Sequence, residues 1–277
     1  MGGILYIVPT PIGNMGDITP RAREVLSSCD FVASEDTRVG GKLLSLIGVK
    51  KPLVRYDAHS TKKSSLAIAE RILAGESCAL ITDAGTPAVS DPGEELVALC
   101  AENGIEVCAL PGACAAVCAL SASGLPSRRF CFEGFLPEGN SERKERIEEL
   151  SREKRTFILY IAPHDTEKYL AELAKQLGER RCVLAKELTK LHERYIRGTV
   201  SEVLDTFTSL PPEAKKGEYV FICEGISEED RFWKDMSVPQ HVEHYCALGL
   251  SRMDACKQVA RDRGVGKGEI YAEINKK

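Results

Sequence analysis

The sequence predicts an α/β protein with two α/β domains and a small helical C-terminal domain. Short apolar runs of strand length alternate with segments of helical spacing through residue 109. The pattern pauses at Leu110-Pro111-Gly112 and then resumes, which marks a hinge. From residue 240 onward only short helices are expected. We therefore expect domains at 1–112, 113–226 and 227–277, which suits a chain of 277 residues.

The first domain combines short buried strands with amphipathic helices. The expected strands are 5–8, 31–34, 53–56, 78–81 and 106–109. The expected helices are 19–28, 38–46, 64–74 and 94–103. Thr19 and Pro20 suit the start of the first helix, because a threonine hydroxyl caps free amides and proline is tolerated in the first turn.

A second alternation forms the second domain. A small-residue helix at 113–123 follows the hinge, and further helices are expected at 141–153, 166–177 and 200–210. The expected strands are 129–132, 156–161, 182–185 and 218–223. The acidic run Glu228-Glu229-Asp230 is typical of a linker, and the last helices include 251–263.

Composition is that of an ordinary globular protein. Hydrophobic residues make up 43% and charged residues 28%, and apolar runs are far shorter than a membrane span. The N-terminus has the pattern of a first strand rather than of a signal peptide. Eleven cysteines are scattered without any C-x-x-C pair, which favours reduced thiols over disulfides or metal ligands. We expect a cytoplasmic protein that does not bind membranes.

The segment 80–93, LITDAGTPAVSDPG, has the pattern of a ligand-binding loop. An apolar strand stops at Asp83, and glycines and prolines prevent a helix until about Glu94. Loops at the carboxyl ends of buried strands are where open α/β sheets bind small molecules. Taken alone, the segment could equally be a strand-to-helix turn in which Asp83 is a local cap.

Five segments occur in an order typical of one family. They are VPTPIGNMGDITPRA from Val8, ASEDTR from Ala33, ITDAGTPAVSDPG from Ile81, LPGACAAVCALSASGLP from Leu110 and ELTKLHE from Glu187. With them the chain resembles the tetrapyrrole methylase superfamily, and within it the type I 2′-O-methyltransferases of cytidine in small-subunit ribosomal RNA. This resemblance implies S-adenosylmethionine bound in an interdomain cleft, a homodimer, and a cytidine ribose in the decoding region of 16S rRNA as substrate.

The resemblance also implies a set of cofactor-binding residues. They are Pro9, Thr10, Pro11, Ile12, Asp83, Ala84, Gly85, Thr86, Val89, Gly112, Ala113, Cys114, Tyr160, Ile161, Ala162 and Leu188. Asp83 is in this interpretation a cofactor contact rather than a base. No G-x-G-x-x-G follows the first strand, which argues against a dinucleotide-type site.

Catalytic candidates come from the EDTR and ELTK segments. The resemblance places Glu35, Asp36 and Arg38 near the transferred methyl group, although alone they could simply pair with one another. A ribose hydroxyl must be aligned with the sulfonium methyl and lose a proton, which requires no metal. The candidates for this role are Asp36, Glu35, His59, His164, Lys186 and Lys190. Asp36 and Lys190 are favoured as members of the polar site, with the base unassigned.

RNA binding must depend on local basic clusters, because the net charge is −4. The available clusters are Arg128-Arg129, then Arg143, Lys144, Arg146, Arg152, Lys154 and Arg155, and Arg180-Arg181. Each could equally be a solvated helix face, which is the favoured interpretation for the helix at 141–153 with its interleaved glutamates. We favour Arg128 and Arg129, which we expect beside the cleft. The basic C-terminal helices could clamp RNA or pack in a dimer, and His241 and His244 there are expected at the surface. Two alternatives stay open: a tetrapyrrole carbon methyltransferase, and a noncatalytic ribosome-binding protein of this fold.

Overall fold

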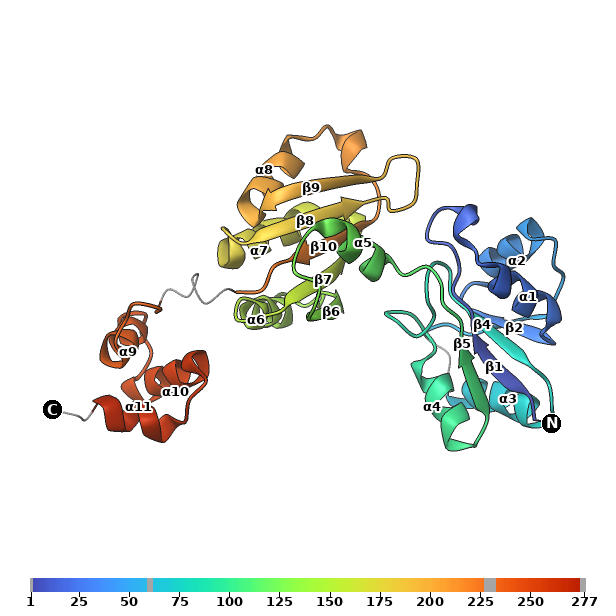
Figure 1. Ribbon diagram of the computed structural model, residues 1–277, viewed down its shortest axis with the longest axis horizontal. Coiled ribbons are helices and arrows are strands. Elements are labelled where there is room, and N and C mark those ends of the chain that lie inside the picture. Colours follow the sequence, from blue (N-terminus) through green and yellow to red (C-terminus); the bar gives the residue numbers. More distant parts are fainter. Residues whose placement is uncertain (1, 59–61, 227–232, 275–277) are drawn as a thin grey trace.

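The computed structural model describes residues 2–58, 62–226 and 233–274. It contains two five-stranded sheets, each covered by helices, and a separate group of C-terminal helices (Figure 1). The predicted fold class is thereby confirmed. His59 and the expected acidic linker Glu228-Glu229-Asp230 lie outside the described residues. No helix among the described residues is long and apolar enough to cross a membrane.

The first sheet is entirely parallel, with the strand order β3-β2-β4-β1-β5. Its strands are β1 (Ile4–Ile7), β2 (Phe31–Ser34), β3 (Leu53–Arg55), β4 (Cys78–Ile81) and β5 (Glu106–Ala109). Its helices are α1 (Pro20–Ser28), α2 (Thr37–Leu46), α3 (Lys62–Leu73) and α4 (Glu94–Glu102), with a short 3-10 turn at Met15–Asp17. Because the strands are parallel, the PTPIGN, EDTR and Asp83 segments all leave the same edge of this sheet.

Alternating side chains give the first sheet two buried faces. Phe31 and Leu80 point into a core shared with α3 and α4, whereas Val32 and Ile81 pack against α1 and α2. Both faces are covered, so these strands have continuous apolar sequences rather than a polar alternation. That property made them recognisable in the sequence.

The second sheet is mixed and has the order β6-β7-β10-β8-β9. Its strands are β6 (Phe130–Phe135), β7 (Thr156–Ile161), β8 (Arg181–Lys186), β9 (Arg194–Thr199) and β10 (Tyr219–Cys223). Only β6 and β7 are parallel; the other neighbours are antiparallel. The edge strand β9 was not predicted from the sequence, and it forms a hairpin with β8 around the ELTKLHE segment.

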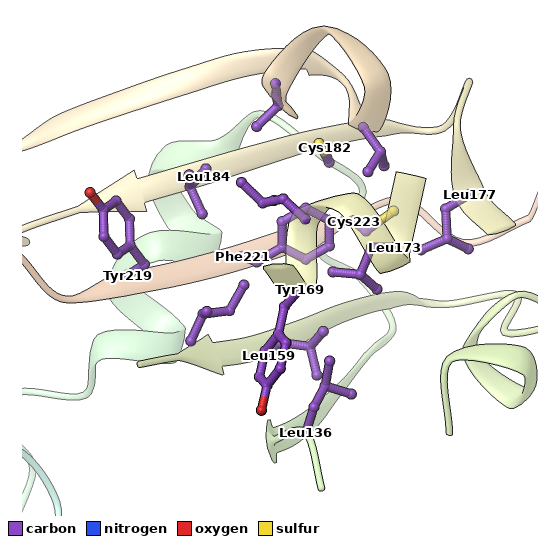
Figure 2. Packing of buried hydrophobic residues seen from close by; sticks show 14 of the residues in the cluster. Leu136, Leu159, Tyr169, Leu173, Leu177, Cys182, Leu184, Tyr219, Phe221 and Cys223 are labelled. Carbon is purple, nitrogen blue, oxygen red and sulfur yellow. The ribbon is translucent and has the colours of Figure 1, made fainter. Parts of the chain in front are cut away.

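Helices cover both faces of the second sheet. They are α5 (Ala115–Ser123) on one face, and α6 (Asn140–Leu150), α7 (Thr166–Leu177) and α8 (Val200–Ser209) on the other, with 3-10 turns at Pro163–Asp165 and Pro212–Lys215. Figure 2 shows Leu159 and Phe221 of the sheet packed against Leu173 of α7. On the opposite face, Ile158 and Val220 pack against α5, in a cluster that Ile12 of the first domain joins. The two domains are therefore connected by apolar packing beside the cleft.

The chain passes between the two sheets from the end of β5 at Ala109 to the start of α5 at Ala115, which surrounds the expected boundary at 112. The last described helices are α9 (Val238–Ala247), α10 (Arg252–Arg263) and α11 (Lys267–Ile274). They share a core of their own. The exact domain boundaries stay a prediction.

The expectation of a surface position was wrong for His241, which is completely buried. Its ring lies between Trp233 and Tyr245, with centroid distances of 5.2 and 5.3 Å. Its Nε2 is 3.3 Å from the Asp262 carboxylate, and Arg263 Nε donates to its Nδ1. His241 follows Val238 by three residues, so helical spacing places it on the buried face.

Candidate functional site

A cavity of about 380 Å³ lies between the loops at the carboxyl edge of the first sheet and the second domain. This volume is within the usual range for sites that hold small molecules. Eleven of the cofactor residues expected from the sequence line it: Ile12, Asp83, Ala84, Gly85, Thr86, Val89, Cys114, Tyr160, Ile161, Ala162 and Leu188. The structure therefore gathers segments from both domains around one space.

The other five expected cofactor residues, Pro9, Thr10, Pro11, Gly112 and Ala113, are not among those that line the cavity, and Thr10 and Pro11 line a neighbouring hollow instead. The backbones of Thr10 and Gly85 exchange hydrogen bonds of 2.8 and 3.1 Å. Thr86 Oγ1 donates to the carbonyl of Ala113 at 2.9 Å. A Cβ on Gly112 would lie 2.4 Å from the Cβ of Pro9, so this position requires glycine. These residues hold the three first-domain loops together rather than facing the cavity.

Several lining residues were not predicted from the sequence. They are Ser90, Asp91, Ala115, Phe135, Pro163, Glu218, Tyr219 and Val220. Asp91 belongs to the loop that the sequence analysis identified, and its carboxylate was the available signal. Glu218 and Phe135 gave no such signal, because only the pairing of β10 with β7 and of β6 with β7 brings them to the cavity.

One wall of the cavity is acidic. Glu35, Asp83 and Asp91 all line it. The Thr82 hydroxyl donates to Glu35 Oε2 at 2.6 Å. Burial, with the charge of Glu35, raises the pKa of Asp91 to about 6. Burial also raises the pKa of Asp83. The hydrogen bond from the Asp36 amide lowers this pKa, whereas the nearby Glu35 and Asp36 carboxylates raise it further. Such a wall favours a ligand that carries positive charge.

The lining from the second domain is mostly aromatic and apolar. Tyr160 contacts Phe132 and Phe135 edge to face, at centroid distances of 4.9 and 5.5 Å. The Ala116 amide donates to the Tyr160 hydroxyl at 3.2 Å, which connects this wall to the start of α5. A flat apolar ring could be buried against these side chains while a charged end faces the carboxylates.

Within the EDTR segment, only Glu35 reaches the cavity. Asp36 is the N-cap of α2, where its carboxylate accepts from the Arg38 amide and from the Arg38 guanidinium. These hydrogen bonds with Arg38 hold the pKa of Asp36 well below its usual range. The Arg38 side chain is 89% exposed. Asp36 is therefore a poor proton acceptor, and it instead positions Asp83 through its own amide, 3.2 Å from Oδ1.

The ELTK segment reaches across from the second domain to the first. Lys190 Nζ is 3.0 Å from Glu187 and 2.9 Å from Glu218. Burial disfavours its charged form, but hydrogen bonds to Glu218 and Glu187 outweigh this and raise the pKa of Lys190. A Cβ on Gly13, at φ +154°, would lie 2.5 Å from Lys190 Cγ. Lys190 thus remains a cation packed on the PTPIGN loop and is not a base.

Backbone strain is concentrated around the cavity. In the described part of the chain, the non-glycine residues with positive φ are Ala88, Ser90, Glu187 and Thr189. They belong to the Asp83 loop of the first domain and the ELTK loop of the second. Such conformations cost about 1–3 kcal/mol each and are often found where a ligand must be held. Both loops carry lining residues, Val89 and Leu188.

Two of the other base candidates, Lys186 and His164, are not among the residues that line the cavity. Lys186 Nζ donates to the carbonyl of Ala214, and the side chain of His164 is 81% exposed beside Asp165. His59 lies outside the described residues. Among the residues that the structure places, no group of His, Cys, Asp and Glu could hold a metal ion.

Comparison with known proteins now assigns the family. Residues 4–204 match the family model of the tetrapyrrole (corrin/porphyrin) methylases. The chain belongs to this family. It is also 42% identical to ribosomal RNA small subunit methyltransferase I of Synechocystis sp., over 97% of this chain and 96% of that protein. The corresponding proteins of Bacillus subtilis and Pasteurella multocida are 41% and 47% identical, over 97% of this chain and 93% and 95% of theirs.

Solved structures of tetrapyrrole methylases share the fold. The uroporphyrin-III C-methyltransferase from Thermus thermophilus, complexed with S-adenosyl homocysteine, aligns with a TM-score of 0.54 and 17% identity. The alignment covers 80% of this chain and 97% of that one. A cobalt precorrin-4 methyltransferase gives a TM-score of 0.58 and 20% identity, over 79% and 94% of the two chains. The expectation of a methyltransferase of this family is confirmed.

Three of the basic residues considered for RNA binding in this tetrapyrrole methylase differ from their expected positions. Arg143 is buried and bonded to Glu172 and to the carbonyls of Pro137 and Glu138, so it stabilises the second domain instead of facing RNA. Arg128 and Arg129 are exposed but do not lie beside the cleft. They directly precede β6, whose opposite end reaches the cavity at Phe135. That expectation was wrong because the strand runs toward the cleft from these residues.

Proposed function

We propose that this protein transfers a methyl group from S-adenosylmethionine to the 2′-oxygen of a cytidine ribose in the decoding region of small-subunit (16S) rRNA. The carrying observation is the cavity with one acidic and one aromatic wall, in a chain that is 42% identical to a protein named ribosomal RNA small subunit methyltransferase I. A homodimer and a cytoplasmic location stay predictions.

The residues present fit S-adenosylmethionine. The sulfonium and amino groups of this cofactor are positive and can face Glu35, Asp83 and Asp91. The adenine can be buried against Tyr160, Leu188 and their apolar neighbours. When bound, the cofactor supplies a methyl group that is already activated by its sulfonium.

Asp83 is the carboxylate best placed for the acceptor side. It lines the cavity and also a neighbouring hollow formed by the PTPIGN loop and α2. A ribose that enters from this hollow would reach Asp83, because this residue lines both spaces. The proton of a hydroxyl becomes acidic only as the new bond forms, so a modest base is sufficient. Beyond the cofactor contact expected from the sequence, Asp83 can orient the hydroxyl and then accept its proton, since its raised pKa makes it more basic than Asp36. This assignment departs from the sequence-based interpretation, in which Asp83 was not the base.

The test is methylation of small subunits that lack the modification, with labelled S-adenosylmethionine and mapping of the labelled nucleotide. We expect label on the ribose of a decoding-region cytidine. Asp83→Asn should lower kcat/KM by about 10²–10⁴-fold. The matched control is Asp205→Asn, an exposed carboxylate of α8 that should leave the rate unchanged.

Other outcomes would replace the proposal. Label on a base, or in another RNA, would contradict ribose methylation of 16S rRNA. Label in a tetrapyrrole precursor but not in small subunits would assign a carbon methyltransferase. Tight binding of subunits and cofactor without any label would indicate a noncatalytic ribosome-binding protein.

A further inference from the structure

A second hollow lies at the end of the second sheet farthest from the cavity. Five basic and two acidic side chains line it: Arg128, Arg129, Arg152, Lys154 and Arg155, with Glu153 and Glu224. This is a local excess of positive charge on a chain whose net charge is −4. Such an excess on an acidic protein suits a polyanion.

The cations of this hollow fall into two groups. Arg155 donates to Glu153 through two of its guanidinium nitrogens, at 2.8 and 2.9 Å, and Arg152 donates to Glu148 at 2.7 Å. In contrast, Arg128, Arg129 and Lys154 are exposed, and no ion pair or hydrogen bond of their side chains is found among the described residues. These three cations are available to an external anion.

Their backbone is held in place. The Thr156 hydroxyl donates to the carbonyl of Pro126 at 2.5 Å, which joins the Arg128 segment to the Lys154 segment. The Ile226 amide donates to the Glu153 carbonyl at 2.7 Å. A Cβ on Gly225 would lie only 2.2 Å from the Lys154 carbonyl, so the two chains are in close contact. The three cations therefore project from a rigid base, which lowers the entropy lost when they bind.

The hollow is well separated from the cofactor cavity. Arg129 precedes β6, and Phe135 at the other end of β6 lines the cavity. At about 3.3 Å per residue, six residues of strand span roughly 20 Å. A group bound at these cations lies too far away to be the methylated nucleotide itself.

We infer that Arg128, Arg129 and Lys154 form a distal anchor for backbone phosphates of the small-subunit rRNA, away from the nucleotide that is methylated. This rests on the proposed function for the identity of the RNA. Phosphate contacts fix the position and register of a nucleic acid without reading its bases, which suits an anchor remote from the target.

The experiment uses the triple variant Arg128→Ala, Arg129→Ala, Lys154→Ala of the full chain and purified unmethylated small subunits. We expect KM for subunits and the dissociation constant from sedimentation to rise about tenfold. The slope of log binding constant against log salt should decrease in magnitude by about 2, because three phosphate contacts are lost. The dissociation constant for S-adenosylmethionine and kcat at saturating subunits should not change.

A control triple, Arg23→Ala, Lys50→Ala, Lys63→Ala, removes the same charge from exposed positions outside the hollow. Equal loss of binding in both triples, or an unchanged KM and salt slope in the first, would overturn the inference. Failure of the proposed function is distinguishable, because the wild-type protein would then label no subunits while sedimentation still reports on the anchor.

Discussion

The raised pKa of Asp91 allows the electrostatics of the cavity to be tested by mutation. Its carboxyl lines the cavity beside Glu35, and burial raises its pKa from 3.8 to about 6. In the unfolded chain this carboxyl has released its proton by about pH 5, whereas the folded protein still holds it. Stability is therefore lost as the pH rises between about 4 and 6, and the whole cost is present above pH 6.

The substitution Asp91→Asn removes this cost. A shift of about two pKa units corresponds to at most about 3 kcal/mol, and to about 1 kcal/mol once solvent screening of this half-buried group is allowed for. We expect the ligand-free variant to melt about 2–4 °C above the wild type at pH 8. At pH 5 the wild-type carboxyl is mostly protonated, so the two proteins should melt at the same temperature.

Binding of S-adenosylmethionine should change in the opposite direction. The variant loses one carboxylate that faces a cation, and we expect its affinity to fall about tenfold at pH 8. Calorimetry at pH 6 in buffers of different ionisation enthalpy should show proton release on binding to the wild type and none in the variant. A variant that melts below the wild type at pH 8, binds S-adenosylmethionine with unchanged affinity and releases as many protons as the wild type would refute the reasoning.

Two further predictions concern the framework of the site. Gly112→Ala should weaken cofactor binding and lower the free energy of unfolding by about 1–3 kcal/mol, because the new Cβ would collide with Pro9. Gly268→Ala, with open space around it, is the control. Equal effects of the two substitutions in calorimetry and thermal melting would contradict the prediction. Arg143→Met should cost about 3–5 kcal/mol by leaving Glu172 and two carbonyls without their donor. On the same helix, the partly exposed Arg146→Met should cost less than about 1 kcal/mol in chemical denaturation, and a similar loss in both would refute a special role for Arg143.

The buried strands were predictable because each is a short continuous apolar run, whereas β9 was not. Its sequence, RYIRGT, is polar and lies at the edge of the sheet, where only one side needs a hydrogen-bonded neighbour. His241 shows a different failure. Its type suggested the surface, but its spacing from Val238 indicated the buried face, and spacing was the stronger signal.

The residues of the cavity also fall into those that the sequence predicted and those that it did not. Residues within one contiguous loop, such as Asp83 to Thr86, were predicted to share a site, and the structure brings them together at the cavity. Glu218 was not predicted to belong to the site, because only the antiparallel pairing of β10 with β7 brings it to the cavity. The misplacement of Arg129 was avoidable, since a residue that begins a strand lies at the edge opposite the loops that follow strands in open α/β sheets.

The Asp83 loop connects the carboxylates of the cavity to the contact between the two domains. It carries Asp83 and Asp91, and its backbone bridges the PTPIGN loop through Gly85. Farther along, Ser90 adopts a positive φ and approaches Gly134, where a Cβ would lie 2.9 Å from its hydroxyl oxygen. Because one strained segment contacts the second domain and also holds the carboxylates, a movement between the domains must change the distance of those charges from the ligand. Binding of a positive ligand at this wall should therefore be coupled to the relative position of the two domains.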